Sequence, residues 1–121
     1  MTKEKIGKQR IQDILGDRST KIIEHFESIS PDFAKYIVDF VYGDLYARKN
    51  FSDKNRELAA VACMIGRGQT GLPIKAHLKG MLNVGWTKDE IIELIIFLSA
   101  YAGFPSTVEV LGTLKEVLAQ N

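Results

Sequence analysis

One histidine inside an apolar helical stretch is the residue of this chain best suited to chemistry. His77 lies three residues after Ile74 and four before Met81, so all three share one side of a helix. We expect an imidazole on such an apolar side to be partly shielded from water, which disfavours its charged form and leaves a neutral ring able to act as a general base. We therefore expect His77 to transfer protons. The alternative is a core histidine that hydrogen-bonds a backbone carbonyl.

Glu57, at the start of another apolar segment, is the expected partner of His77. Taken alone, its carboxylate is explained by the positive end of a helix dipole or by solvation. A glycine-rich stretch, residues 66–71, separates the two segments and can reverse the chain. Glu57 lies nine residues before this stretch and His77 six residues after it. A stagger of about one helical turn would therefore bring the two side chains within reach.

The remaining polar residues are weaker candidates for chemistry. Arg56 is a third candidate, because a guanidinium can bind a substrate carboxylate. Arg67 offers the same chemistry, although for either arginine a surface charge is the more common role. The single cysteine, Cys63, is expected to be a small core residue. Glu93 either lines a site or an interface or marks the solvated edge of its helix, and His25 is expected on the surface.

The composition excludes several classes of protein. One cysteine rules out an intramolecular disulfide, a CxxC redox pair and a multi-cysteine zinc site, and two histidines are too few for a convincing metal site. A net charge of +1 without a basic block gives no sign of nucleic-acid binding. The longest apolar runs, residues 58–65 and 94–98, are too short to cross a membrane. Because the N-terminus is polar, we expect a cytoplasmic protein.

The hydrophobic pattern and the turn residues predict helices throughout and no strands. Six expected helices cover about residues 3–15, 19–28, 53–65, 73–85, 88–102 and 105–119. A further helix begins at Pro31, and its apolar residues at helical spacing are Phe33, Ile37, Phe40, Val41 and Leu45. Thr87 and Glu90 form the pattern of a capping box. No linker divides these elements, so we expect one all-α domain, a bundle of about six to seven helices.

Two of these helices are apolar on nearly every side. Residues 58–65 are apolar at every position, and residues 91–102 are apolar except at Glu93 and Ser99. Such helices must be covered on all sides, but a domain of this size buries only about two-thirds of its chain surface. We therefore expect a homo-oligomer, in which neighbouring subunits cover what one chain leaves bare. The alternative is a central helix pair within a compact monomer.

Several short motifs match a known family in order. They are Arg56-Glu57-Leu58, Ala76-His77-Leu78-Lys79-Gly80, Gly85-Trp86-Thr87-Lys88-Asp89-Glu90-Ile91-Ile92-Glu93 and Tyr101-Ala102-Gly103-Phe104-Pro105. Together they resemble the carboxymuconolactone decarboxylase family over about residues 31–118. The resemblance implies a single all-helical, alkylhydroperoxidase-D-like domain over residues 1–121, assembled as a hexamer or trimer.

One branch of that family resembles alkylhydroperoxidase D and carries a CxxC pair shortly before the histidine. The two cysteine positions fall at about Thr70 and Pro73 in this sequence, and neither residue can form a thiolate. The resemblance therefore implies the branch without CxxC. An antioxidant protein of the alkylhydroperoxidase or peroxiredoxin kind is an alternative.

The other branch resembles a decarboxylase that removes carbon dioxide from a carboxymuconolactone without a metal or an organic cofactor. This resemblance implies a small carboxylic acid or lactone as the substrate. It also implies proton transfer by His77, orientation of His77 by Glu57 and binding of an oxyanion by Arg56. A second alternative is a non-catalytic oligomeric binding protein that keeps the fold.

Overall fold

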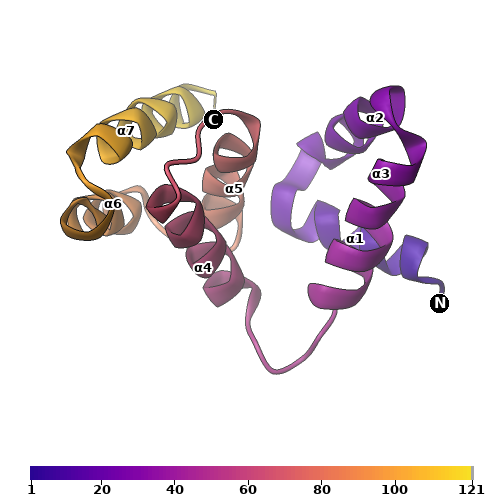
Figure 1. Cartoon of the computed structure of the whole chain (residues 1–121). Coiled ribbons are helices and arrows are strands. Elements are labelled where there is room, and N and C mark those ends of the chain that lie inside the picture. Colours follow the sequence, from indigo (N-terminus) through magenta and orange to yellow (C-terminus); the bar gives the residue numbers. More distant parts are fainter. Residues whose placement is uncertain (121) are drawn as a thin grey trace. The chain divides into compact units, whose positions relative to one another are not determined.

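The computed structural model describes residues 1–120, and every regular element in this range is a helix. The elements are α1 Lys3–Leu15, η1 Gly16–Arg18, α2 Ser19–Ile29, α3 Pro31–Lys35, η2 Tyr36–Leu45, α4 Asp53–Gly66, α5 Leu72–Asn83, α6 Lys88–Ala102 and α7 Phe104–Ala119 (Figure 1). The all-α class is confirmed, and the predicted boundaries hold to within two residues except for the helix that begins at Pro31. Across residues 1–120, none of the helices combines the length and the apolar character that crossing a membrane requires.

Contacts within the chain divide it into two compact units. Unit 1 is Met1–Asp53 and contains α1, η1, α2, α3 and η2. Unit 2 starts at Lys54 and contains α5, α6, α7 and all of α4 except its first residue. Each unit buries apolar residues of its own. The single domain expected from the sequence stays a prediction.

In unit 1, α1 packs closely against η2 through two glycines. Gly7 on α1 is buried, and a Cβ at this position would overlap the carbonyl oxygen of Val38. Gly43 on η2 makes the matching contact, because a Cβ there would overlap the carbonyl oxygen of Lys3. The two backbones thus touch where any side chain would hold them apart. The buried apolar residues come from α1, α3 and η2 and are Ile11, Ile14, Leu15, Ala34, Val38 and Tyr42.

The helix that begins at Pro31 differs from its predicted form. It is α-helical only over α3 and continues as a π-helix, η2, whose wider turns pair residues five apart. Its inner face is made by Ala34, Val38 and Tyr42. Three residues of the stripe predicted at α-helical spacing are instead exposed, namely Phe33, Phe40 and Leu45. The contact with α1 decides which side of α3 and η2 faces inward. Because that contact joins residues far apart in the sequence, the helical spacing alone did not reveal it.

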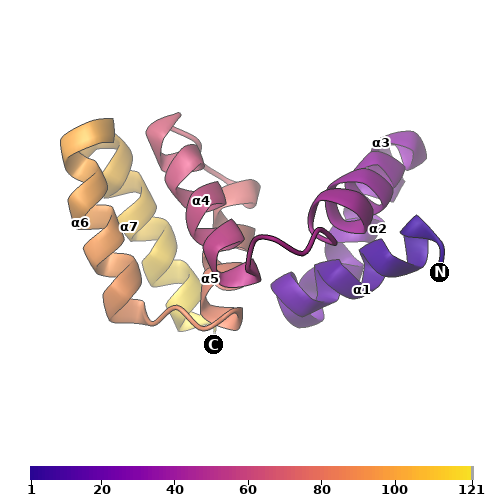
Figure 2. The same ribbon diagram turned by 90° about the horizontal axis from the view of Figure 1, so that it is seen from below.

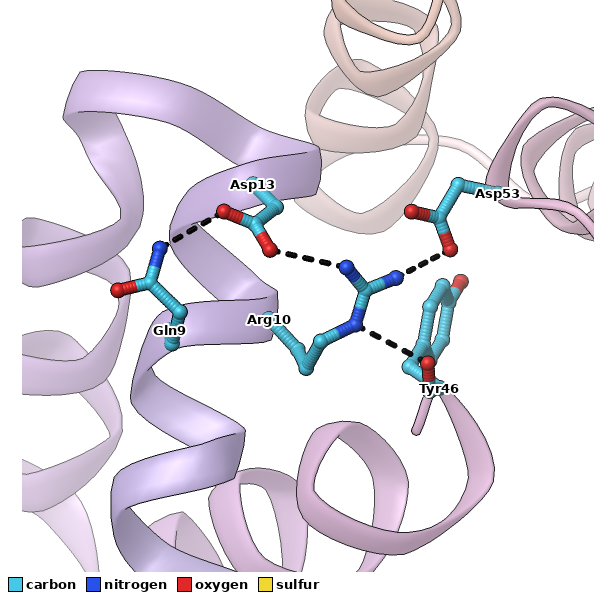
Figure 3. Close-up of polar contacts among 5 residues, drawn as sticks. All are labelled: Gln9, Arg10, Asp13, Tyr46 and Asp53. Atoms are coloured by element: carbon cyan, nitrogen blue, oxygen red, sulfur yellow. Dashed lines mark hydrogen bonds and ion pairs between the residues drawn. The ribbon is translucent and has the colours of Figure 1, made fainter. Parts of the chain in front are cut away.

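A polar network around Arg10 holds the segment that follows η2 (Figure 3). The guanidinium donates to the Tyr46 carbonyl oxygen at 3.1 Å and to Asp13 at 2.9 Å, and it also binds Asp53. Gln9 donates to the other oxygen of Asp13 at 2.8 Å. Partial burial works against the charge of Arg10, but the carboxylates of Asp53 and Asp13 outweigh it and raise the pKa of the guanidinium above its ordinary value. Arg10 therefore ties the end of unit 1 to α1.

Unit 2 is built from α4, α5, α6 and α7, and each of these helices contributes to one core (Figure 2). The core residues are Val61, Ile65, Ile74, Leu78, Met81, Ile91, Ile95, Val110, Leu114 and Val117. α6 and α7 lie side by side and meet at Gly103, whose φ of 87° is in the left-handed region that favours glycine.

The predicted capping box is present at the start of α6. Thr87 Oγ1 accepts a hydrogen bond from the Glu90 N–H at 3.1 Å, and Glu90 Oε1 accepts one from the Thr87 N–H at 3.0 Å. The bond from the Thr87 N–H lowers the pKa of Glu90. Two of the donors that a helix N-terminus leaves without partners are thereby satisfied.

Unit 2 also leaves apolar surface uncovered on α6 and α7. The residues concerned have exposed fractions from 48% to 77% and are Ile96, Phe97, Tyr101, Phe104, Val108 and Leu111. On α4, Ala59 and Cys63 are exposed as well. The two helices that are apolar on nearly every side are therefore not fully covered within the chain. We call the six residues on α6 and α7 the bare face.

Gly7→Ala is expected to lower the free energy of unfolding by about 1–3 kcal/mol, because the new methyl group overlaps a backbone carbonyl. The matched control is Gly112→Ala in α7, where a Cβ meets nothing within 4 Å. There the higher helix propensity of alanine should stabilise the protein by about 0.5–1 kcal/mol. Urea denaturation followed by circular dichroism measures both variants. A Gly7→Ala protein as stable as the wild type would contradict the close packing.

Candidate active site

Glu57 and His77, the two residues expected to pair, are in direct contact. His77 Nδ1 lies 2.6 Å from Glu57 Oε1, a short separation typical of a charge-assisted hydrogen bond. The Glu57 side chain is 0% exposed, and the His77 side chain is 19% exposed. The structure thus joins a fully buried carboxylate to an imidazole that solvent or a ligand can still reach.

The core-facing row of α4 positions the carboxylate. Glu57, Val61 and Ile65 follow one another at four-residue spacing, and all three are buried. A carboxylate in that row loses the water that would stabilise its charge, so it needs a hydrogen-bond donor inside the protein. His77 supplies such a donor from α5.

On α5, the imidazole lies beside the helix's own buried row. Ile74, Leu78 and Met81 are fully or almost fully buried, whereas His77 is only partly buried. Pro73 lies in the first turn of α5, where a missing N–H costs no helical hydrogen bond. The predicted apolar stripe therefore exists, and His77 lies at its edge.

Trp86, which the sequence interpretation did not single out, fixes the segment after α5 against the start of α4. Its Nε1 donates to the Lys54 carbonyl oxygen at 2.8 Å, and Lys54 Nζ lies 4.5 Å from the centroid of its ring. Trp86 follows His77 in the chain and Lys54 precedes Glu57, so the two contacts show that the glycine loop reverses the chain. A lone tryptophan just beyond a helix was the available signal, because a shielded indole N–H usually finds an acceptor.

The geometry of the pair decides which ring nitrogen remains available. An ionised carboxylate can only accept hydrogen bonds, so with Glu57 ionised the hydrogen between the two side chains belongs to Nδ1 of His77. Nε2 is then left for other partners. It can accept a proton when the ring is neutral and donate one when the ring is charged.

The other predicted site residues do not form part of the contact between Glu57 and His77. Arg56 is partly buried on α4, and as the neighbour of Glu57 it projects from a different side of the helix. Arg67, Glu93 and His25 are exposed, as expected of surface residues. Within residues 1–120, no group of three or more His, Cys, Asp and Glu residues is arranged to hold a metal ion.

The expectation that Cys63 is a core residue was wrong. Cys63 is exposed, because the inward row of α4 runs through Val61 and Ile65 and Cys63 lies on another side of the helix. An apolar segment with no polar position gave no sign of which side faces inward. Thr70 lies in the exposed loop before α5, and Pro73 lies in its first turn.

The chain is similar to known proteins over most of its length. Residues 31–116, which include Glu57 and His77, match the model of the carboxymuconolactone decarboxylase family. The chain is 29% identical over 106 residues to 4-carboxymuconolactone decarboxylase of Acinetobacter baylyi, covering 87% of this chain and 78% of that protein.

Two further relatives match over smaller shares of their own length. Nitrosuccinic acid decarboxylase of Metarhizium robertsii is 30% identical over 73 residues, which cover 60% of this chain and 50% of that protein. Peroxisomal protein 2 of Saccharomyces cerevisiae is 28% identical over 101 residues, which cover 80% of this chain and 35% of that protein.

His77→Ala is expected to lower the free energy of unfolding by about 1–3 kcal/mol, because it takes a donor from a fully buried carboxylate. Combining it with Glu57→Leu should restore part of that loss, since no buried charge then remains. Urea denaturation of the wild type, both single variants and the double variant gives the coupling free energy. Simply additive effects would argue against a stabilising pair.

Proposed function

Because the chain belongs to the carboxymuconolactone decarboxylase family, we propose that it is a cofactor-independent decarboxylase or lactone-processing enzyme acting on a small carboxylic acid. The observation that supports this most is the contact between His77 Nδ1 and Glu57 Oε1. It leaves one imidazole nitrogen for proton transfer to a substrate. Two relatives are named decarboxylases, in agreement with this type of reaction.

In the proposed reaction, the bond between the departing carboxylate and its carbon breaks, and the electron pair stays on that carbon. Carbon dioxide leaves, and a neighbouring electron-withdrawing group delocalises the pair. His77, protonated on both ring nitrogens, gives its Nε2 proton to the carbon and becomes neutral. A proton from solvent then restores the imidazolium. The net change in the substrate is the loss of carbon dioxide and the gain of one proton.

Glu57 acts in this scheme as a positioning residue. Its carboxylate accepts the Nδ1 hydrogen and thereby fixes the orientation of the ring. Its complete burial supports this role, because no water competes for the hydrogen bond. Arg56 is proposed to bind an oxyanion of the substrate, because its guanidinium offers several hydrogen-bond donors.

The proposed substrate class follows from what the two named decarboxylases share. Their names describe carboxylic acids that also carry a lactone or a nitro group, and both groups withdraw electrons. We extend this chemistry to the present chain. In its substrate, the carbon that loses the carboxyl group would lie next to an electron-withdrawing group. That group would stabilise the electron pair left on the carbon. The electron pair then needs no metal or organic cofactor to receive it.

Peroxide reduction by a cysteine pair does not fit the residues of this chain. Cys63 is the one cysteine in the sequence, and Thr70 and Pro73 occupy the positions where the pair would be expected. A non-catalytic binding protein would keep the pair of Glu57 and His77 for stability alone, and kinetic measurements separate this alternative from catalysis.

With 4-carboxymuconolactone and then nitrosuccinate as substrates, His77→Ala is expected to lower kcat about 10²–10⁴-fold, the usual contribution of general acid–base catalysis. Glu57→Gln should lower kcat by a smaller factor and change KM little, because Glu57 acts through His77. Arg56→Ala should mainly raise KM. Ultraviolet absorbance and release of carbon dioxide follow the reaction.

The matched control for these kinetics is His25→Ala, which removes the other histidine from an exposed position on α2. It should leave kcat and KM unchanged. If wild-type protein turns over neither substrate faster than His77→Ala does, the proposed reaction is wrong for these acids. Substrate binding without turnover would then support the binding protein.

We also propose that the chain assembles as a homo-oligomer, a hexamer or trimer as the family resemblance implies. The bare face on α6 and α7 supports this, because large apolar side chains that a chain leaves exposed can mark an interaction site. Phe97 and Tyr101 pack ring against ring within it, with centroids 5.4 Å apart. Aromatic residues of this kind are enriched in protein interfaces.

Sedimentation velocity is expected to give a species of three or six times 13.5 kDa for the wild type. Phe97→Glu should shift it toward the monomer, because a charge on the bare face would be buried without a partner. Ile29→Glu, at an apolar residue of α2 that is 73% exposed, is the control and should leave the assembly intact. A wild type that sediments as a monomer would refute the proposal.

A further inference from the structure

Unit 1 contains two adjoining hollows, and neither Glu57 nor His77 lines them. One has a volume of about 180 Å³ and is walled by α1, α2, α3 and η2. The other has a volume of about 270 Å³ and lies along α3 and η2. Both are lined by Lys35 and Asp39, so these two residues stand where the hollows meet. Each hollow has room for a small molecule.

Asp39 carries a carboxylate oxygen without a partner at this junction. Its Oδ1 is buried, and no hydrogen-bond donor within residues 1–120 reaches it. A buried acceptor in this state is unfavourable, and a charged one more so. Most buried polar groups in folded proteins have a partner, so such an exception points to a missing donor. The Asp39 residue as a whole is partly exposed and lines both hollows.

The nearby lysines leave room for a donor from outside the chain. Lys8 lines the smaller hollow, but its ammonium donates to Glu4 at 3.0 Å. Glu27 adds a further negative charge to the same wall. Lys35 is the one remaining cation of that wall. The lining of the smaller hollow carries Glu4, Glu27 and Asp39 against Lys8 and Lys35, and Lys8 is already paired.

The backbone at Asp39 is also unusual. Asp39 lies in the π-helix η2, and π-helical turns occur frequently at functional sites. The close glycine contact between α1 and η2 holds this segment in place. Asp39 is thus presented from a rigid part of unit 1, as a binding residue should be.

We propose that the junction of the two hollows at Asp39 is a binding site for a small organic ammonium ion, whose N–H groups donate to the Asp39 carboxylate. An ammonium group supplies both the hydrogen that the buried oxygen lacks and the positive charge that the carboxylate favours. The short carbon chain of such a molecule would lie along the apolar parts of the hollow, which include Ile23, Ala34 and Val38. This site is independent of the proposed decarboxylase reaction.

The test is a saturation-transfer difference NMR titration of the full chain with n-propylammonium chloride at constant ionic strength. A saturable signal with a dissociation constant on the order of 1–10 mM is expected for so small a ligand. Tetramethylammonium has the same charge but no N–H group, and it should give no saturable signal. Equal binding of the two cations would overturn the proposal, because no hydrogen bond to Asp39 would then be needed.

Variants of the chain complete the test. Asp39→Asn keeps the size of the side chain and should weaken n-propylammonium binding at least fivefold. The matched control Asp32→Asn removes an exposed carboxylate that lines only the larger hollow and should change binding less than twofold. Circular dichroism checks that both variants are folded. Unchanged binding in Asp39→Asn would overturn the proposal.

Two more measurements ask whether Lys35 or an inorganic cation accounts for the signal. Lys35→Met removes a cation that lines both hollows and should leave binding equal or tighter. Weaker binding in that variant would show that the charge of Lys35 does not oppose the probe, and it would overturn the assignment to the Asp39 carboxylate. Displacement of n-propylammonium by potassium more strongly than by sodium would assign the site to an inorganic cation and overturn the ammonium proposal.

Discussion

The burial of one carboxylate constrains the whole of unit 2. Glu57 lies in the core-facing row of α4 and has no exposed surface. A carboxylate removed from water is stable only with hydrogen-bond donors around it. The donor at 2.6 Å is His77, so α5 must return alongside α4 in one register. The contact between Trp86 and Lys54 sets the same register from the other side. A shift of either helix would break both contacts.

The same contact carries the proposed chemistry. With Glu57 ionised, its carboxylate accepts the Nδ1 hydrogen of His77, and the proposed proton transfer then uses Nε2. The imidazole keeps 19% of its side chain exposed, so a ligand can still reach it. The same hydrogen bond therefore stabilises the buried carboxylate and supports the proposed reaction. The chain belongs to the carboxymuconolactone decarboxylase family, and two of its relatives are named decarboxylases.

Unit 1 is held together in a different way. Its helices approach through Gly7 and Gly43, where backbone meets backbone, and Arg10 ties down the segment that follows. This close approach goes together with a π-helix and a carboxylate, Asp39, whose buried oxygen has no donor within residues 1–120. Both units also expose apolar side chains, including Phe40 in unit 1 and Phe97 in unit 2. Burial within a single chain of this size is not enough to cover them.

The sequence alone determined the helical class and nearly all helix boundaries, because caps, glycine stops and apolar periodicity act between residues close along the chain. It made the pairing of Glu57 with His77 an expectation, and the contact between their side chains confirmed it. It did not determine which side of an evenly apolar helix faces inward, so Cys63 was misplaced. It also did not show the π-helix of η2, because α-helical and π-helical spacing look alike over two turns. Only the tertiary structure decided these points. The contacts responsible, Gly7 with Val38 and Trp86 with Lys54, join residues about 30 apart, and no local preference encodes such contacts.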